Sequence, residues 1–286
     1  MSDRRWRRAV GGAAGLVMVA TLPLWAQQTW RTMTSARQMA GERRLEVDVT
    51  YGAGTLRVEP ERGNLLYRME MRYDENAVRP VSAYDRARGT LRLGIDWRDG
   101  RRQSGDRNGD GRATIALTPS VPMGLDLEFG AGKADVALGG LALESVDIST
   151  GASETRVSFD RPNRVEARAV KLESGASSLR VTGLANARAA RIEFDGGVGE
   201  TTLDFGGTWT RSTSASVKMG IGSVNLRLPR NVGIRIEKDS FLTSFDSRGL
   251  VKRGKAWYSP NYERAAHKLD IDIDAAIGSI DVQWID

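Results

Sequence analysis

The sequence predicts an all-β protein, a single-domain β-solenoid of roughly 22-residue coils with antiparallel hairpin strands capping its N-terminal end. Three observations carry this prediction. A short glycine-containing turn recurs along the chain, the residues after each turn alternate between polar and apolar, and glycine is abundant (32 of 286 residues) while proline is scarce (8). Many glycines with few prolines favour tight turns over flexible linkers.

Residues 1–26 have the layout of a secretory signal peptide. Four arginines within the first eight residues precede an uncharged apolar stretch over residues 9–24, and the small residue Ala26 closes it. The alternative is an uncleaved membrane anchor, for which this stretch is short. In both cases the arginines hold the N-terminus in the cytoplasm, so we expect everything after Ala26 to be exported to the periplasm or the cell surface.

The composition excludes several classes of site. Cysteine is absent and His267 is the single histidine, which excludes a disulfide framework, a cysteine-based zinc or iron–sulfur site and a multi-histidine metal site. Without the four arginines and one aspartate of residues 1–26, the formal net charge of +6 falls to +3. A chain this close to neutral lacks the basic signature of a nucleic-acid-binding protein.

Residues 27–44 have a helix-compatible composition and no turn pattern, so we expect a tether or a short helix there. The solenoid is expected to fill residues 45–286. Its first part differs from the rest, because residues 65–73 and 89–95 are longer alternating strands. We expect the hairpin strands of residues 65–117 to cap the N-terminal end, since an uncapped end would expose a sheet edge.

A three-residue turn that contains glycine marks each coil. In the four residues after each turn, the second and fourth face one side and the first and third face the other, as in a half-buried strand. One such unit cannot bury its own apolar side, so successive units are expected to stack about 4.8 Å apart. Residues 230–268 interrupt the spacing, and we interpret them as an insertion. The turns are Gly52-Ala53-Gly54, Gly130-Ala131-Gly132, Gly151-Ala152-Ser153, Gly175-Ala176-Ser177, Gly197-Val198-Gly199, Gly220-Ile221-Gly222 and Ala276-Ile277-Gly278.

If the coils stack in register, they form exposed columns on the strand that follows the turn. The charges in these columns are mixed, and neither column stacks carboxylates as a polysaccharide-cleaving β-helix would require. One column reads Lys133, Glu154, Ser178, Glu200, Ser223, and its neighbour reads Asp135, Arg156, Arg180, Thr202, Asn225.

The order of these segments resembles the toast-rack family of exported bacterial β-solenoid proteins. The alternating hairpin strands are followed by a polar loop, then by Val121-Pro122-Met123-Gly124-Leu125 leading into a Gly-Ala-Gly turn, and later by Gly222-Ser223-Val224-Asn225-Leu226. The resemblance covers roughly residues 45–286 and extends to C-terminal domains of cell-wall-antibiotic-response proteins and to proteins proposed as adhesins. It implies a location in the cell envelope, with a role in stress sensing or surface contact, and it implies no catalytic residue.

Residues 106–111 match the first half of a calcium loop. Asp106, Asn108 and Asp110 supply oxygen ligands at its first, third and fifth positions, and Gly111 stands at the sixth. The twelfth position, where a bidentate acid is expected, is Leu117. The alternative is a polar hairpin loop rich in turn-forming residues, and its flanking arginines oppose a bound cation. Apart from calcium at this loop, we expect no cofactor.

Three aspartates, Asp270, Asp272 and Asp274, lie on one face of one strand. Neighbours in this set are about 6.8 Å apart, a spacing that permits a glycosidase pair. The alternative, which we favour, is a solvated strand face. His267 is interpreted as a surface histidine, because no nucleophile motif lies near it. The tryptophans Trp209, Trp257 and Trp284 are expected to plug coil ends instead of binding sugars.

These observations favour a non-catalytic protein of the cell envelope, a rigid scaffold or binding module for an envelope protein or a cell-wall or surface glycan. We expect no nucleic-acid partner, and membrane contact only through the N-terminal segment if it is uncleaved. The alternatives are a calcium-assisted adhesin that uses residues 106–111 and a carbohydrate-binding or carbohydrate-active β-helix protein that uses Asp272.

Overall fold

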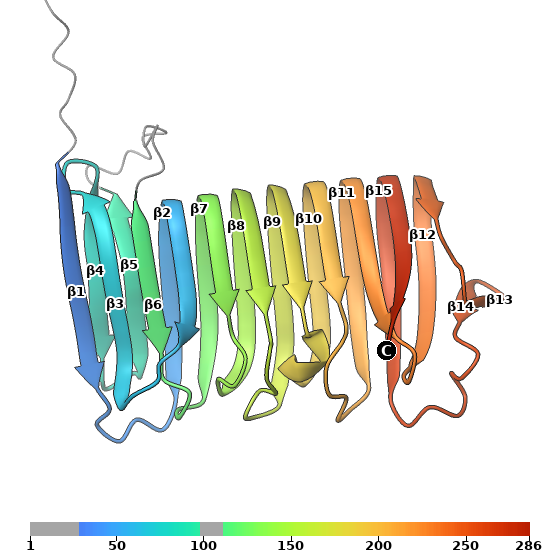
Figure 1. The fold of residues 1–286 in the computed structure, drawn as a ribbon, viewed down its shortest axis with the longest axis horizontal. Coiled ribbons are helices and arrows are strands. Elements are labelled where there is room, and N and C mark those ends of the chain that lie inside the picture. Colours follow the sequence, from blue (N-terminus) through green and yellow to red (C-terminus); the bar gives the residue numbers. More distant parts are fainter. Residues whose placement is uncertain (1–28, 98–110) are drawn as a thin grey trace, which may run out of the picture.

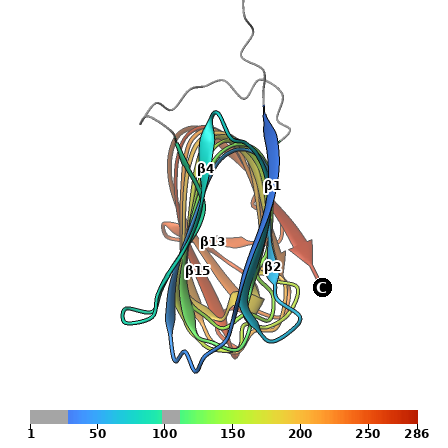
Figure 2. The ribbon, with the colours of Figure 1, turned by 90° about the vertical axis from the view of Figure 1, so that its left-hand side faces the viewer.

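The structure, a computed structural model, describes residues 29–97 and 111–286. These residues form one sheet of 15 strands. Figure 1 shows the strands side by side along the long axis, and Figure 2 shows that the sheet turns over at one edge, so that two layers face each other. The buried apolar residues form one core cluster between the layers. The predicted all-β solenoid is therefore confirmed.

Five long strands form the central coils, and each rises through one layer, turns a corner and descends through the other. Neighbouring coils pair in parallel, residue by residue, as the repeat predicts. The inward residues consequently stack in columns such as Leu127, Ile148, Leu172, Phe194 and Val217, all buried. The strands are β7 (Met123–Ala137), β8 (Leu143–Ser158), β9 (Ala167–Thr182), β10 (Ala189–Asp204) and β11 (Thr213–Pro229).

The corners form one edge of the stack, which we call the corner edge. At Gly132 the backbone has a φ of +110°, and a Cβ there would lie only 2.2 Å from the carbonyl oxygen of Gly54 in the next coil. Only glycine allows this approach of bare backbone to bare backbone. Ser153 and Ser177 hold the same place in β8 and β9, and neither has a positive φ.

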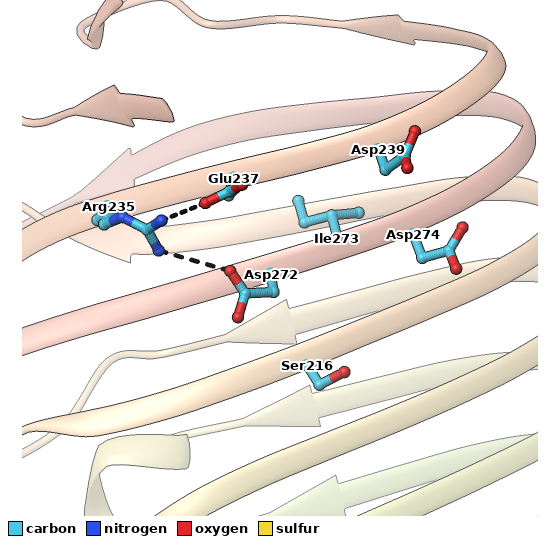
Figure 3. Close-up of a pocket in the computed structure, with 7 residues that line it drawn as sticks. All are labelled: Ser216, Arg235, Glu237, Asp239, Asp272, Ile273 and Asp274. Carbon is cyan, nitrogen blue, oxygen red and sulfur yellow. Dashed lines mark hydrogen bonds and ion pairs between the residues drawn. The ribbon is translucent and has the colours of Figure 1, made fainter. Parts of the chain in front are cut away.

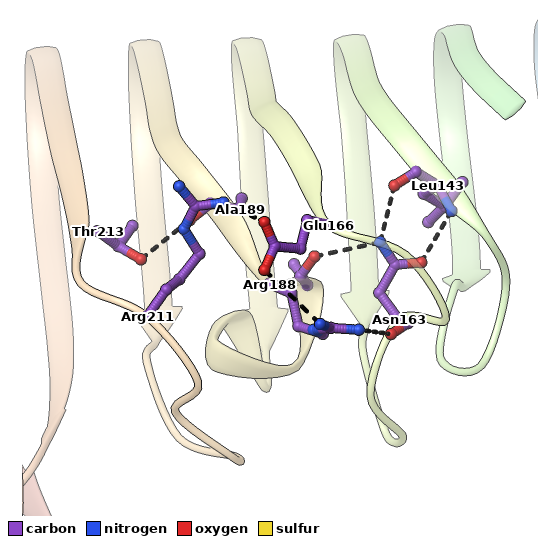
Figure 4. A network of polar contacts seen from close by, with 8 residues as sticks. Leu143, Asn163, Glu166, Arg188, Ala189, Arg211 and Thr213 are labelled. Atoms are coloured by element: carbon purple, nitrogen blue, oxygen red, sulfur yellow. Dashed lines mark hydrogen bonds and ion pairs between the residues drawn. The ribbon is translucent and has the colours of Figure 1, made fainter. Parts of the chain in front are cut away.

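The opposite edge carries the connecting loops, and we call it the loop edge. The buried Asn163 side chain donates from Nδ2 to the Leu143 carbonyl at 2.7 Å and accepts at Oδ1 from the Leu143 amide at 2.8 Å (Figure 4). Arg188, whose φ is +53°, donates from Nη1 to the Asn163 carbonyl at 3.2 Å. Thr213 donates to the Ala189 carbonyl at 2.9 Å. Individual polar side chains therefore hold this edge together.

The N-terminal end is capped by antiparallel strands, as the sequence predicts. The first coil, β2 (Leu45–Pro60), pairs in parallel with β7 on one side. On its other side it pairs in parallel with β5 (Thr90–Trp97) before the corner and with β6 (Arg112–Leu117) after it. Outside these, β4 (Val78–Asp85) pairs antiparallel with β5, and β3 (Leu65–Asp74) pairs antiparallel with β6.

The prediction for residues 27–44 was wrong where the structure describes them. Trp30–Gln38 form a strand, β1, which pairs antiparallel with β3 along its whole length. Met33 packs against the core, and Ser35 hydrogen-bonds Tyr67 and Ser82 at 3.1 and 2.7 Å. The open edge of β3 offers unpaired backbone groups, and pairing with them outweighs the local helix-compatible composition.

At the C-terminal end, part of the expected insertion 230–268 is a further coil. Strand β12 (Gly233–Phe245) pairs in parallel with β15 (Lys268–Ile285), which lies between β11 and β12 (Figure 1). The segment between β12 and β15 forms the short strands β13 (Val251–Arg253) and β14 (Ala256–Tyr258) instead of a coil, and β14 pairs antiparallel with β12. The repeat pattern missed β12 because its corner contains no glycine.

Candidate binding surface

The outward side chains lie on two faces of the stack, separated by the corner edge. Strand halves after the corner form one face, which we call the mixed-charge face. Its predicted columns are observed, since Lys133, Glu154 and Ser178 are direct neighbours on adjacent coils. Glu154 forms ion pairs with Arg156 at 2.5 Å and with Lys133 at 3.6 Å. The charge of Glu154 is therefore neutralised by neighbours on the same face.

Strand halves before the corner form the other face, which we call the acidic face. Its two central columns follow from the backbone register, and acidic side chains greatly outnumber basic ones in them. The acidic residues are Asp48, Glu128, Asp126, Asp147, Glu173, Glu193, Asp195, Asp272, Asp274, Glu237 and Asp239, and the basic residues are Arg92, Lys171 and Lys218.

Three aspartates of the acidic face stack on successive coils. Asp126 lies in register with Asp48 on one side and with Asp147 on the other. Partial burial, and then the charges of Asp147, Asp48 and Glu128, raise the pKa of the Asp126 carboxyl. The sequence analysis did not predict this column, because its predicted columns cover only the strand that follows each turn. The same register applied to the strand before the turn would have shown it.

At the C-terminal end of the acidic face lies an open depression of about 430 Å³. Figure 3 shows Asp272 and Asp274 from β15 beside Glu237 and Asp239 from β12. Arg235 bridges the two strands, because its guanidinium pairs with Glu237 and lies 3.5 Å from the Asp272 carboxylate. Arg235 therefore pairs with two of the four carboxylates, those of Glu237 and Asp272.

The three aspartates of β15 have different surroundings. Tyr262 donates to Asp270 at 2.8 Å, and burial together with this bond raises the pKa of Tyr262 to about 12. Asp272 lies beside Arg235. Asp274 stands in register with Asp239 on β12, and neither has an ion pair or a side-chain hydrogen bond within residues 29–97 and 111–286. On its other side Asp274 lies in register with Lys218 of β11, so Asp239 is the carboxylate at the outer end of this column.

The described residues hold no group of three or more acidic, histidine or cysteine side chains that could bind a metal ion. The calcium loop predicted at Asp106, Asn108 and Asp110 lies outside them, as does the signal peptide predicted at residues 1–26. His267 is half-buried, and its carbonyl accepts a hydrogen bond from the Gly233 amide at 3.0 Å. In the part of the chain that is described, no helix is long and apolar enough to cross a membrane.

The three predicted tryptophan plugs all make packing contacts. Trp209 and Trp284 pack against the core, and their indole nitrogens donate to the carbonyls of Phe205 and Arg248 at 3.1 and 2.8 Å. Trp257 meets Phe245 edge to face, with ring centroids 5.0 Å apart. These rings are engaged with the protein itself, as the sequence predicts.

Two protein families match the chain. One, described as the N-terminal domain of toast_rack, matches residues 26–182, which is more than half of the chain. The other, described as the C-terminal region of LiaF of the cell wall-active antibiotics response, matches residues 185–282. The two matches together span all the coils of the stack. No curated protein matches the chain.

Solved structures share the fold at low sequence identity. A "putative cell adhesion protein" from Clostridium sporogenes has a TM-score of 0.50 and 14% identity, over 90% of this chain and 100% of that one. A "putative adhesin" from Bacteroides fragilis has a TM-score of 0.37 and 12% identity, over 90% of this chain and 98% of that one. The first of these supports the solenoid architecture and says nothing about a ligand.

Proposed function

Because the chain belongs to the toast-rack family, we propose that it is a non-catalytic binding module of the cell envelope whose acidic face holds a basic segment of another envelope protein. The LiaF-like region and the adhesion-related structural neighbour fit an envelope-associated β-solenoid. The basic and apolar stretches of residues 1–26 support export, with the solenoid in the periplasm or at the cell surface.

The observation that carries this proposal is the difference in charge between the two faces. On the mixed-charge face Glu154 forms ion pairs with Lys133 and Arg156. On the acidic face Asp274 and Asp239 stand side by side without an ion pair among the described residues, although Lys218 of β11 is the other register neighbour of Asp274. Like charges held together by a fixed backbone register are unfavourable in the free protein. A cationic partner relieves this repulsion, so charge complementarity favours a basic segment over a neutral glycan.

The geometry of the depression supports a non-catalytic role. Asp272 and Asp274 lie in an open depression, and Asp272 is 71% exposed and paired with Arg235, so its carboxylate is already engaged with a cation of the protein itself. Neither matching family is described by a reaction.

The test is site-specific photo-crosslinking of the tagged full chain in cells, with mass spectrometry of the products. Crosslinkers replace Ser149 or Ser216 on the acidic face, and Ser178 or Ser223 on the mixed-charge face as matched controls. We expect one envelope protein to be captured from the acidic face alone, through a basic peptide, and to be lost in the double variant Asp239→Asn, Asp274→Asn. Equal capture from both faces, or capture of glycan alone, would contradict the proposal.

A second measurement addresses catalysis directly. Purified protein is incubated with cell-wall glycan, and new reducing ends are counted for the wild type and for Asp272→Asn. We expect no turnover in either. Turnover that disappears in Asp272→Asn would replace the binding module by a carbohydrate-active enzyme.

A further inference from the structure

One column at the corner edge changes its chemistry halfway along the stack. The middle residue of the corner is alanine in four successive coils, at Ala53, Ala131, Ala152 and Ala176. In the next four coils of the stack the equivalent residue is large and apolar. These four are Val198, Ile221, Ile277 and Leu242, which are neighbours in that order.

These side chains are exposed. The four are 46–62% exposed, and Phe241, beside Leu242, is 85% exposed. Together they are five of the six exposed large hydrophobic residues within residues 29–97 and 111–286, so the clustering is not a scatter of single surface residues. We call Val198, Ile221, Phe241, Leu242 and Ile277 the corner ridge.

Most positions that flank the corner ridge are glycines; the exceptions are Ala276 and Thr243. A Cβ at Gly222 would lie 1.8 Å from the Gly199 carbonyl oxygen, and a Cβ at Gly278 would lie 1.6 Å from that of Gly222. These positions cannot carry side chains, so the apolar chains between them stand clear of their surroundings. Adjacent coils are about 4.8 Å apart, which makes the corner ridge a straight row without polar groups between its members.

The corner edge is also where the described chain begins. β1 starts at Trp30, opposite Asp74 of β3, and this end of β1 lies level with the tops of the coils (Figures 1 and 2). The apolar stretch of residues 9–24 precedes it in the sequence. In the uncleaved form of the chain, a membrane that holds this stretch therefore faces the corner edge. Trp30 lies at 4.4 Å from the Arg72 guanidinium, and this combination of side chains suits a membrane interface.

We propose that the corner edge rests on a lipid surface and that the corner ridge inserts its apolar side chains into the bilayer interface. A straight, level row can touch a plane along its whole length, and lipid requires no directional polar contact from it. The ridge lies at the far end of the stack from Trp30, so the two contacts would hold the solenoid lengthwise along the membrane with both faces free.

A second copy of the chain fits the corner ridge less well. Strand β12, which ends the stack and carries Phe241 and Leu242, turns Lys238 inward, into the column that holds Ile273 and Val217 in the preceding coils. An inward charge is a device that discourages edge-to-edge pairing. The acidic residues below the ridge, which include Asp195, Glu200, Asp239 and Asp274, would also repel those of a second ridge.

The test uses the absence of cysteine from the chain. A single cysteine at Ala276→Cys, on the corner edge, or at Thr210→Cys, on the loop edge, carries an environment-sensitive dye on the full chain in phosphatidylcholine vesicles. We expect a blue shift and quenching by lipid-borne quenchers at position 276 and neither at position 210. Vesicles that also contain phosphatidylglycerol should give a smaller shift at low salt, which salt restores, because the acidic residues below the ridge are repelled.

The matched variant replaces all five ridge residues by alanine, the residue that the same columns carry at Ala131 and Ala276. It should fold normally and lose the shift at position 276. Equal signals at positions 276 and 210, or a shift that survives the alanine variant, would overturn the proposal. A shift that needs native membranes and fails in lipid vesicles would assign the ridge to a protein, and a concentration-dependent shift without vesicles would assign it to a second copy.

Discussion

The two edges of the stack turn the chain by different means. At the corner edge most coils contact one another through glycine backbone, and the same three-residue sequence pattern recurs in successive coils. At the loop edge each connection is different and is held by its own polar side chains, such as Asn163 and Thr213. Because glycine backbone makes the corner, its exposed middle residue can vary from alanine to isoleucine. At the loop edge the side chains are used in hydrogen bonds that hold the fold together.

The strongest test of this comparison adds one methyl group at the corner edge. Gly222→Ala places a Cβ 1.8 Å from the Gly199 carbonyl oxygen at a φ of +145°, so we expect a loss of about 3 kcal/mol or more in the free energy of unfolding. The control, Gly254→Ala, has a positive φ and open space around it, and should cost about 1 kcal/mol. Urea denaturation of both variants measures the difference, and equal losses would show that backbone packing does not shape the corner.

A change at the loop edge should cost less. Asn163→Ala leaves the buried amide and carbonyl of Leu143 without their partner, so we expect a loss of about 2–3 kcal/mol. Arg164→Ala on the same loop removes an exposed hydrogen bond to the Gly140 carbonyl and should cost less than about 0.5 kcal/mol. If both variants unfold at the same denaturant concentration as the wild type, the loops are not held by Asn163.

On the acidic face between the edges, a substitution should stabilise the protein. Asp126→Asn removes a charge that is partly buried and that Asp147 and Asp48 repel, and we expect a gain of about 0.5 kcal/mol at pH 7. The pKa of Asp126 is raised in the folded state, so its charge destabilises the fold above that pKa and has no effect once it is protonated in both states.

The gain from Asp126→Asn should therefore disappear as the pH falls below about 4. Asp135→Asn on the mixed-charge face is the control, because it removes an ion pair with Arg57 at 3.7 Å and should give no gain. Thermal unfolding of both variants across this pH range checks the sign. A gain for Asp126→Asn that persists at low pH would contradict an electrostatic cause.

The smallest effect is expected on the exposed corner residue itself. Ile221→Ala should change the free energy of unfolding by less than about 0.5 kcal/mol, because half of the side chain is already in water. Leu226→Ala on the same strand removes a fully buried side chain and should cost about 2–5 kcal/mol. A large loss for Ile221→Ala would mean that the corner ridge serves folding, not an external contact.

What could be predicted follows the same division. The glycine corners and the alternation after them gave the register of the mixed-charge face, down to Lys133 beside Glu154. The Asn163 contacts occur in one loop and depend on tertiary structure, so no repeat in the sequence predicts them. Strand β1 was missed because the edge of β3 decides its conformation, and β12 was missed because Phe241 and Thr243 replace the corner glycines. The acidic face could have been predicted, because its columns follow the same register as those of the mixed-charge face.

The position of β15 has a consequence for the order of events when the chain folds. Each central coil can settle onto the one made before it, in the direction of synthesis. Strand β12 cannot, because its partner β15 follows it in the chain and lies between it and β11. Ile236 can pair with Trp257 of β14 beforehand, but the β15 side of Ile234 and Ile236 must wait until β15 has been made and inserted between β12 and β11. The C-terminal end of the stack therefore forms last, when β15 pairs with β11 and β12 together.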